Sequence, residues 1–239
     1  RVSRLRASLV APTPATRVAA LLIGLVIAGS FAFLVSRYPD LPGLLPVRFR
    51  RNGTPIGWQY KTFGRVLLPV FIQIALALTL GAIGLLLLSR RHGEPDALAP
   101  DVGAAKTASE AVILITLIWV AFQGYTSLAL SDMWQKERAG LGRWYYYLQL
   151  LGLVLTGIVA VRAHVKLGRP APRPFVPGHW RFGQLYKNAE DPALFVPTRN
   201  GARWTLNFGR PVAAALLALI LGVGVIGPAV ILVLALRWN

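Results

Sequence analysis

The sequence predicts an all-α membrane protein with about five transmembrane helices and a small surface module, with room for a β-hairpin, between helices 4 and 5. Of its 239 residues 55% are hydrophobic, whereas soluble domains are usually about 45 to 50% apolar. These residues gather into five runs, each near or above the roughly 20 residues that cross a hydrocarbon core. One long polar stretch, residues 162–210, is too charged to cross lipid.

The apolar runs divide the chain into four parts. We expect a basic N-terminal flank at 1–17, a four-helix membrane domain at 18–161 with a proline-rich loop at 38–62, a polar surface module at 162–211 and a C-terminal transmembrane helix at 212–239. The five predicted spans are residues 18–36, 66–89, 111–130, 144–161 and 212–236.

The first predicted helix follows an arginine-rich flank without acidic residues, as cytoplasmic flanks of first spanning helices often do. The loop at 38–62 contains four prolines and three glycines, which exclude a regular helix. We therefore expect an extended, turn-rich loop, with Asn52-Gly53 as its strongest turn signal.

This loop carries a family resemblance. Its residues include Tyr38-Pro39-Asp40-Leu41-Pro42, Leu45-Pro46-Val47-Arg48-Phe49 and Asn52-Gly53-Thr54-Pro55, followed by Trp58. They resemble an uncharacterised membrane domain that also forms the N-terminal part of Sdp-type bacteriocin immunity proteins, although a histidine often stands in that pattern where this chain has Arg48. The resemblance implies a bacterial integral membrane protein of receptor or immunity type.

The second and third spans contain the polar residues of the predicted membrane domain. Gln73 is the one strongly polar side chain inside the second span, and we expect residues 90–110 to form a solvated loop. In the third span, side chains spaced three or four apart share one helical face. We expect this face to contact other helices, with a ligand pocket as the alternative. The polar stripe consists of Thr116, Trp119, Gln123 and Ser127.

The fourth span opens on Trp144 and three tyrosines, which are typical of an interfacial belt. Near its end, Ala160 and His164 have the spacing by which antenna helices approach a pigment, and histidine can also hold haem iron. His164 is thus the one candidate for a cofactor ligand. A single histidine among basic residues at a helix end is more often an interface residue, so we predict no cofactor.

The surface module alternates bulky and polar residues over 180–186, as a half-buried strand would. We expect a second strand at 194–196, a turn at 198–202 and a further extended segment at 203–208. The segments YKN, EDP, LFVP and WTLNF, within 186–208, are similar to a short uncharacterised cassette of the same group of membrane proteins. Tryptophan, arginine and tyrosine dominate binding interfaces. The predicted partner-binding residues are therefore Trp180, Arg181, Tyr186, Arg199, Arg203 and Trp204.

The fifth span contains a literal GxGxxG at 222–227. A dinucleotide site would need a preceding strand and a later acidic residue. Neither is present in the sequence, so we interpret these glycines as a helix-packing feature.

The formal net charge is +17, yet the basic residues are spread over every connection, which favours anionic lipid over nucleic acid as the partner. With the N-terminus in the cytoplasm, the cytoplasmic connections hold 16 of the 26 Lys and Arg residues. The positive-inside rule therefore predicts this orientation. The predicted location is the bacterial cytoplasmic (inner) membrane, which the chain crosses several times.

The residues that perform chemistry are few and scattered. There is no cysteine, and the nine acidic residues and three histidines are not grouped. We therefore predict neither catalytic residues nor a metal site. The expected function is a non-catalytic receptor or immunity-like protein that binds a partner through its loops, and the alternative is an accessory subunit of a respiratory or photosynthetic complex. Other membrane-protein subunits are expected partners, and a transporter gains little support without an internal repeat.

Overall fold

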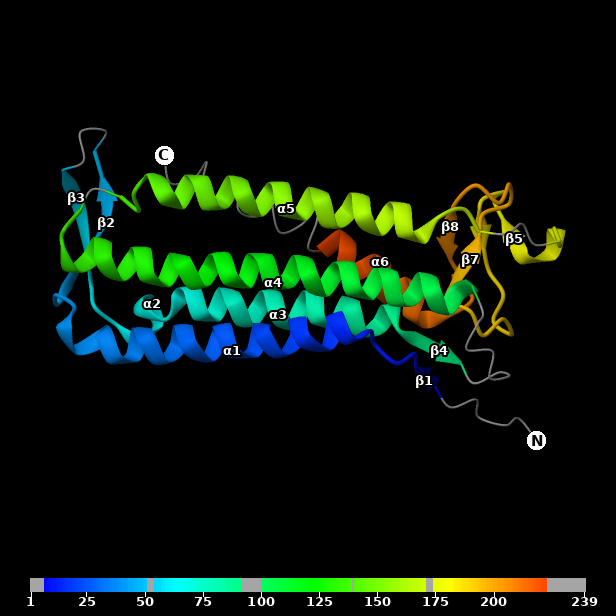
Figure 1. The fold of residues 1–239 in the computed structure, drawn as a ribbon, viewed down its shortest axis with the longest axis horizontal. Helices are drawn as coiled ribbons and strands as arrows, with labels where there is room; N and C mark the ends of the chain where they lie inside the picture. Colours follow the sequence, from blue (N-terminus) through cyan, green and yellow to red (C-terminus); the bar gives the residue numbers. More distant parts are fainter. Residues whose placement is uncertain (1–6, 51–53, 92–99, 139, 171–173, 223–239) are drawn as a thin grey trace. The chain divides into compact units, whose positions relative to one another are not determined.

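The computed structural model describes residues 7–50, 54–91, 100–138, 140–170 and 174–222. The chain forms two compact units. Unit 1 combines residues 1–16, 79–112 and 161–239, and unit 2 combines 17–78 and 113–160. Figure 1 shows the helices and strands of both.

Four helices in the described ranges are long and apolar enough to cross a membrane, as the first four runs predicted. They are α1 (Pro14–Arg37), α3 (Leu68–Leu87), α4 (Pro100–Gln135) and α5 (Arg143–Leu167). The fifth predicted span begins as α6 (Pro211–Leu221). Residues 223–236, with most of the glycine motif, lie outside the described residues.

In unit 2, helices α1, α3 and α4 share an apolar core. Ile23 of α1 packs with Ile113 and Val120 of α4, and Leu76 of α3 lies against them. Large apolar side chains such as Leu21 remain exposed on the outer face of α1. Such exposure is expected where lipid tails, which are as apolar as leucine, surround a helix.

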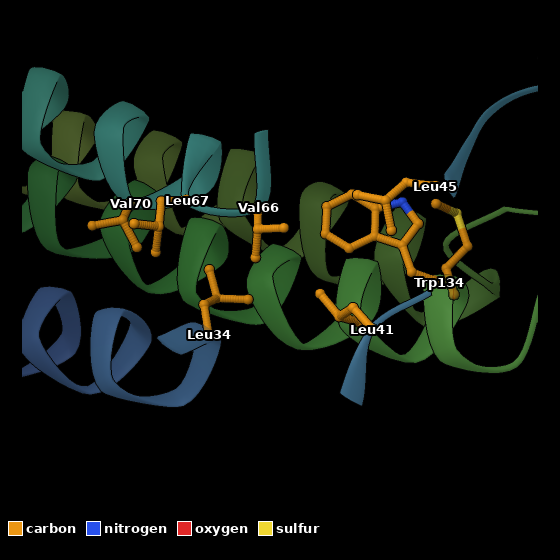
Figure 2. Packing of buried hydrophobic residues seen from close by; sticks show 8 residues of the cluster. Leu34, Leu41, Leu45, Val66, Leu67, Val70 and Trp134 are labelled. Carbon is orange, nitrogen blue, oxygen red and sulfur yellow. The ribbon is translucent and has the colours of Figure 1, made fainter. Parts of the chain in front are cut away.

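A second core of unit 2 joins the ends of α1, α3 and α4 to a hairpin (Figure 2). The hairpin pairs β2 (Leu44–Phe49) with β3 (Pro55–Tyr60) in antiparallel register. The extended loop expected at 38–62 is therefore more ordered than predicted. The hairpin tolerates Pro46 because both strands are edges and the register shifts just after this residue. The core residues are Leu34, Leu41, Leu45, Val66, Leu67, Val70, Met133 and Trp134.

Residues of the first resembling motif fix the base of this hairpin. The ring of Tyr38, in the 3₁₀ turn η1 (Tyr38–Asp40), stacks on Phe63 with centroids 4.0 Å apart. Lys61 Nζ donates to the carbonyl oxygens of Tyr38 at 3.0 Å and Leu41 at 2.7 Å. A short helix, α2 (Phe63–Val66), then leads into α3. The predicted Asn52-Gly53 turn lies outside the described residues.

The solvated loop predicted at 90–110 is wrong for its described part. In unit 1, β4 (Ser89–Arg91) pairs with β1 (Ala7–Leu9), and α4 already begins at Pro100. The helix tolerates its acidic residues because each has a partner. Asp101 forms an ion pair with Arg90 at 3.2 Å.

Glu110, the last residue of the predicted solvated loop, lies inside α4 and is buried. Its Oε2 accepts a hydrogen bond from Thr13 Oγ1 at 2.7 Å, and its Oε1 lies 3.7 Å from Lys166 Nζ. These contacts join the start of α1, the first half of α4 and the end of α5 within unit 1. The acid therefore has a structural role in this unit.

The surface module contains two hairpins, which confirms the prediction of short strands. The first pairs β5 (Trp180–Arg181) with β6 (Leu185–Tyr186), and the second pairs β7 (Phe195–Pro197) with β8 (Trp204–Leu206). The single strand predicted at 180–186 is wrong, because Phe182 (φ 49°) and Gly183 (φ 73°) reverse the chain. The first residues assigned to the module, 162–167, instead continue α5.

The second hairpin packs on the membrane-length helices of unit 1. Leu194 lies in one core with Ile83 and Leu87 of α3 and Leu216 of α6. The buried Arg210, just before α6, donates through Nη1 to the carbonyl oxygens of Ser89 and Pro192, each at 3.0 Å. The module is thus part of unit 1 rather than a loose insert.

Candidate functional site

The two hairpins of the module enclose an open groove with a volume of about 920 Å³. One wall comes from the β5–β6 hairpin and the other from the β7–β8 hairpin. Figure 1 shows strands β5, β7 and β8 of these hairpins in yellow to orange. We call it the basic groove, because it contains two arginines and no acidic residue. Its lining residues are Trp180, Gly183, Gln184, Leu185, Thr198, Arg199, Asn200, Ala202, Arg203, Trp204 and Thr205.

The turn between β7 and β8 sets the positions of both arginines. Thr198 Oγ1 accepts from the backbone N–H of Arg203 at 3.1 Å, and the Thr198 hydroxyl donates to Asn200 Oδ1 at 2.9 Å. Asn200 Oδ1 also accepts from the backbone N–H of Ala202 at 3.1 Å. Gly201 takes a positive φ of 66°, which a glycine adopts without strain. This network makes the turn a rigid support for the arginines on either side of it.

Arg199 lies where the basic groove meets a smaller cavity of about 50 Å³. Its guanidinium carbon is 4.5 Å from the centroid of the Phe175 ring, which is a cation–π contact. Trp180 and Tyr186 line the same small cavity, with ring centroids 5.3 Å apart. The Phe175 ring therefore covers one face of the Arg199 guanidinium and leaves its N–H edge for hydrogen bonding.

Trp204 ties the basic groove to α5. Its Nε1 donates to the carbonyl oxygen of Leu167, the last residue of that helix, at 3.2 Å. This bond satisfies one of the carbonyl groups that a helix end leaves without an intrahelical partner. The groove therefore adjoins the end of a helix that is long enough to cross a membrane.

A buried asparagine, Asn207, connects several backbone segments of the module. Asn207 Nδ2 donates to the carbonyl oxygens of Asn188 at 2.8 Å and Ala193 at 3.2 Å, and its Oδ1 accepts from the backbone N–H groups of Asn188 at 3.1 Å and Gly209 at 2.9 Å. The Gly209 backbone is so close to Asn188 that an added Cβ would lie 2.4 Å from the Asn188 carbonyl carbon. These contacts join the two hairpins into one folded piece.

Four of the six predicted partner-binding residues line the basic groove: Trp180, Arg199, Arg203 and Trp204. Tyr186 lines the neighbouring small cavity, and its hydroxyl donates to Asp191 Oδ2 at 3.0 Å. Arg181 is exposed on β5 and does not line the groove.

Sequence reasoning missed other contributors to the site, namely Phe175, Gln184, Thr198 and Asn200. The sequence Thr198-Arg199-Asn200-Gly201 signalled the turn. It did not signal that the turn residues line a groove, because the opposite wall comes from residues 180–185.

The polar stripe of α4 divides between two kinds of contact. Trp119 Nε1 donates to Thr156 Oγ1 of α5 at 3.2 Å, which is an interhelical hydrogen bond. Ser127 Oγ donates to the carbonyl oxygen of Gln123 within the same helix at 3.1 Å, and Thr116 is fully buried. A cavity of about 350 Å³ between α4 and α5 is lined almost entirely by apolar side chains and by no stripe residue.

His164, the candidate cofactor ligand, is exposed near the end of α5. Among the residues that the structure describes, no three His, Asp or Glu side chains lie close enough together to hold a metal ion. The polar groups that line the basic groove are the guanidinium, amide, hydroxyl and indole groups of its side chains. Groups of these kinds can donate hydrogen bonds to a ligand.

The described part of the chain thus combines four helices that are long and apolar enough to cross a membrane with a folded module that contains a basic groove. Residues 189–213 match a family of unknown function, DUF5808. The matched segment contains β7, β8, Asn207 and Arg210, and it overlaps the cassette noted in the sequence. No curated protein and no solved structure matches the chain.

Proposed function

We propose that this chain is a non-catalytic, multi-pass membrane protein, receptor or immunity-like in type, which binds another molecule through the basic groove. The expected partners are anionic lipid and other membrane-protein subunits, not nucleic acid. The resemblance of residues 38–58 to the Sdp-type membrane domain motivates the receptor or immunity type. The match at 189–213 does not cover that segment, so the type stays a prediction.

The observation that carries the proposal is the placement of Arg199 and Arg203. Both are exposed, both line one groove, and neither has an acidic partner among the described residues. By contrast, Asp101, Glu110 and Asp132 each form an ion pair. Two exposed arginines that line one groove without a carboxylate partner can both bond to an anionic group, so their placement favours binding of an acidic partner.

The proposed location is the bacterial cytoplasmic membrane with the N-terminus in the cytoplasm. This orientation puts 16 of the 26 Lys and Arg residues on the cytoplasmic side, in agreement with the positive-inside rule. The basic groove then faces the leaflet surface that carries most anionic lipid.

The test compares three forms of the full chain purified from native membranes in lipid nanodiscs. These are the wild type, Arg199→Ala/Arg203→Ala, and Arg181→Ala/Lys187→Ala, which removes the same charge outside the groove lining. Mass spectrometry then identifies the proteins and lipids retained with each form. We expect at least one molecule to be retained by the wild type and the control and lost from the groove variant. Identical sets of molecules for all three forms would contradict the proposal.

The second candidate function, an accessory subunit of a larger membrane complex, is favoured by α5. Gly152 is the one buried residue of this helix, and side chains such as Leu150, Leu153 and Val154 are exposed. In lipid such a face suits either acyl chains or a neighbouring subunit. Purification in mild detergent tests the idea. A defined complex that co-elutes with the chain supports it, and a chain that elutes alone excludes it.

A further inference from the structure

We infer that the ligand of the basic groove is an anionic phosphate group, supplied at the membrane surface by a phospholipid headgroup. This inference rests on the proposed function and names the ligand class of the same site. The argument uses the chemistry of the lining, the rigidity of the turn and the place of the groove beside α5.

The lining selects an anion with several acceptor oxygens. The guanidinium groups of Arg199 and Arg203 offer N–H donors in a planar fork, which matches the oxygens of a phosphate. The amide of Gln184 lines the opposite wall and can donate as well. None of the lining residues is a carboxylate, so the groove lacks a counter-charge that would compete for the arginines.

The site is pre-organised. The Thr198 and Asn200 hydrogen bonds fix the turn between the arginines, and the Phe175 ring holds the Arg199 guanidinium at 4.5 Å. A guanidinium that stacks on a ring keeps its in-plane N–H groups for a second partner. Because less side-chain freedom is lost on binding, a pre-organised site binds more tightly than a flexible basic loop of the same charge.

The position of the groove favours a lipid source. The bond from Trp204 Nε1 to the Leu167 carbonyl places the groove at the end of α5, where tryptophans of membrane proteins commonly meet headgroups. Arg162 is exposed on the last turns of the same helix and adds positive charge. At this level the phosphates of anionic lipids are the most abundant anions. The groove volume of about 920 Å³ lies within the range of small-molecule sites, which is about 300 to 1,000 Å³.

The experiment measures ligand retention by native mass spectrometry on the full chain in phosphatidylcholine nanodiscs. One arm adds phosphatidylglycerol, which is anionic through its phosphate. A second arm adds oleic acid, which is anionic without phosphate. A third arm adds soluble glycerol 3-phosphate. We expect the wild type to retain phosphatidylglycerol in preference to phosphatidylcholine and oleate. Retention of glycerol 3-phosphate at the groove, without phosphatidylglycerol, would support the phosphate and overturn the lipid source.

The variants assign binding to the groove. Arg199→Ala/Arg203→Ala should weaken phosphatidylglycerol retention at least about tenfold, because charge-assisted hydrogen bonds are lost. Arg199→Lys/Arg203→Lys keeps the charge and loses the planar fork, so we expect an intermediate loss. The charge-matched control, Arg181→Ala/Lys187→Ala, should stay within about twofold of the wild type, as expected for solvent-exposed charges.

The inference is overturned if oleate and phosphatidylglycerol are retained equally, or if the groove variant retains as much phosphatidylglycerol as the wild type. A groove variant that loses a partner protein but keeps phosphatidylglycerol binding would overturn the phosphate inference and leave the proposed function standing. Both arginines are exposed, so their replacement should leave the fold intact. Hydrogen exchange at the amide of Gly209, which is bonded to Asn207, checks this in every variant.

Discussion

Replacement of Asn207 by alanine should loosen the whole module, because this side chain holds both hairpins. Asn207 is fully buried, and its amide group donates to two or more backbone carbonyls and accepts from two backbone N–H groups. Alanine leaves the N–H groups of Asn188 and Gly209 without that acceptor. A buried donor left unsatisfied costs about 1 to 3 kcal/mol. Because water can enter the space vacated, we expect a local loss of about 3 kcal/mol rather than the full sum.

Hydrogen–deuterium exchange in nanodiscs measures this loss at the residues concerned. A loss of about 3 kcal/mol in local opening free energy corresponds to roughly 100-fold faster exchange. The acceleration should appear at the amides of Asn188 and Gly209. Asn200→Ala is the matched control, since Asn200 is exposed and its hydrogen bonds lie within the β7–β8 turn, not at the amides of Asn188 and Gly209. Exchange in Asn207→Ala that stays within about twofold of the wild type, or equals that of Asn200→Ala, would refute the reasoning.

Three further substitutions test the packing. Gly209→Ala should destabilise the module by more than about 2 kcal/mol, because the new Cβ would lie 2.4 Å from the backbone of Asn188, which hydrogen exchange would report. Gly124→Leu should destabilise unit 2 by about 1 to 3 kcal/mol, since a Cβ there already meets Val26 at 3.2 Å, as measured by unfolding in detergent. Gln73→Leu should change the free energy of unfolding in detergent by less than about 1 kcal/mol. It removes two interhelical hydrogen bonds, to Ser30 and to Val120, which are weak in membranes, and it also removes the buried Oε1, which has no hydrogen-bond partner among the described residues.

Glycines in open space provide the controls for the first two substitutions. Gly178→Ala in the module and Gly29→Leu in α1 of unit 2 introduce a Cβ with nothing within 4 Å. Each should have a much smaller effect than its counterpart. Equal effects at the open and the crowded glycine would show that helix or turn propensity, rather than steric contact, sets the stability. For Gln73→Leu, a decrease of more than about 2 kcal/mol in the free energy of unfolding would contradict the reasoning that its interhelical hydrogen bonds are weak.

The helices could be predicted because length and hydropathy are local properties of the chain. The first eleven residues of α4, 100–110, could not be predicted as helix. Asp101 and Glu110 look like loop residues until Arg90 and Lys166, which lie elsewhere in the sequence, are seen to pair with them. A charge is tolerated in a buried helix when a remote partner neutralises it.

The surface module was likewise predicted only in part from the sequence. The residue types at 180–204 predicted binding, and the turn at 198–202 was readable from its sequence. The reversal at Phe182 was not, because a bulky residue rarely adopts positive φ. Nor could the sequence place Trp180 and Arg203 in one groove, since hydrogen bonds from Asn207 bring the two hairpins together.

The central claim is that membrane-spanning helices carry this chain through the bilayer and hold the basic module at its cytoplasmic surface. The chain has no cysteine, so single cysteines can report which side a residue faces. Phe182 is 95% exposed at the tip of the β5–β6 turn, and Tyr60 is 77% exposed on β3. In intact cells a membrane-impermeant maleimide should label Tyr60→Cys and should label Phe182→Cys only after lysis. Labelling of Phe182→Cys in intact cells, or recovery of the chain in the soluble fraction, would contradict the account.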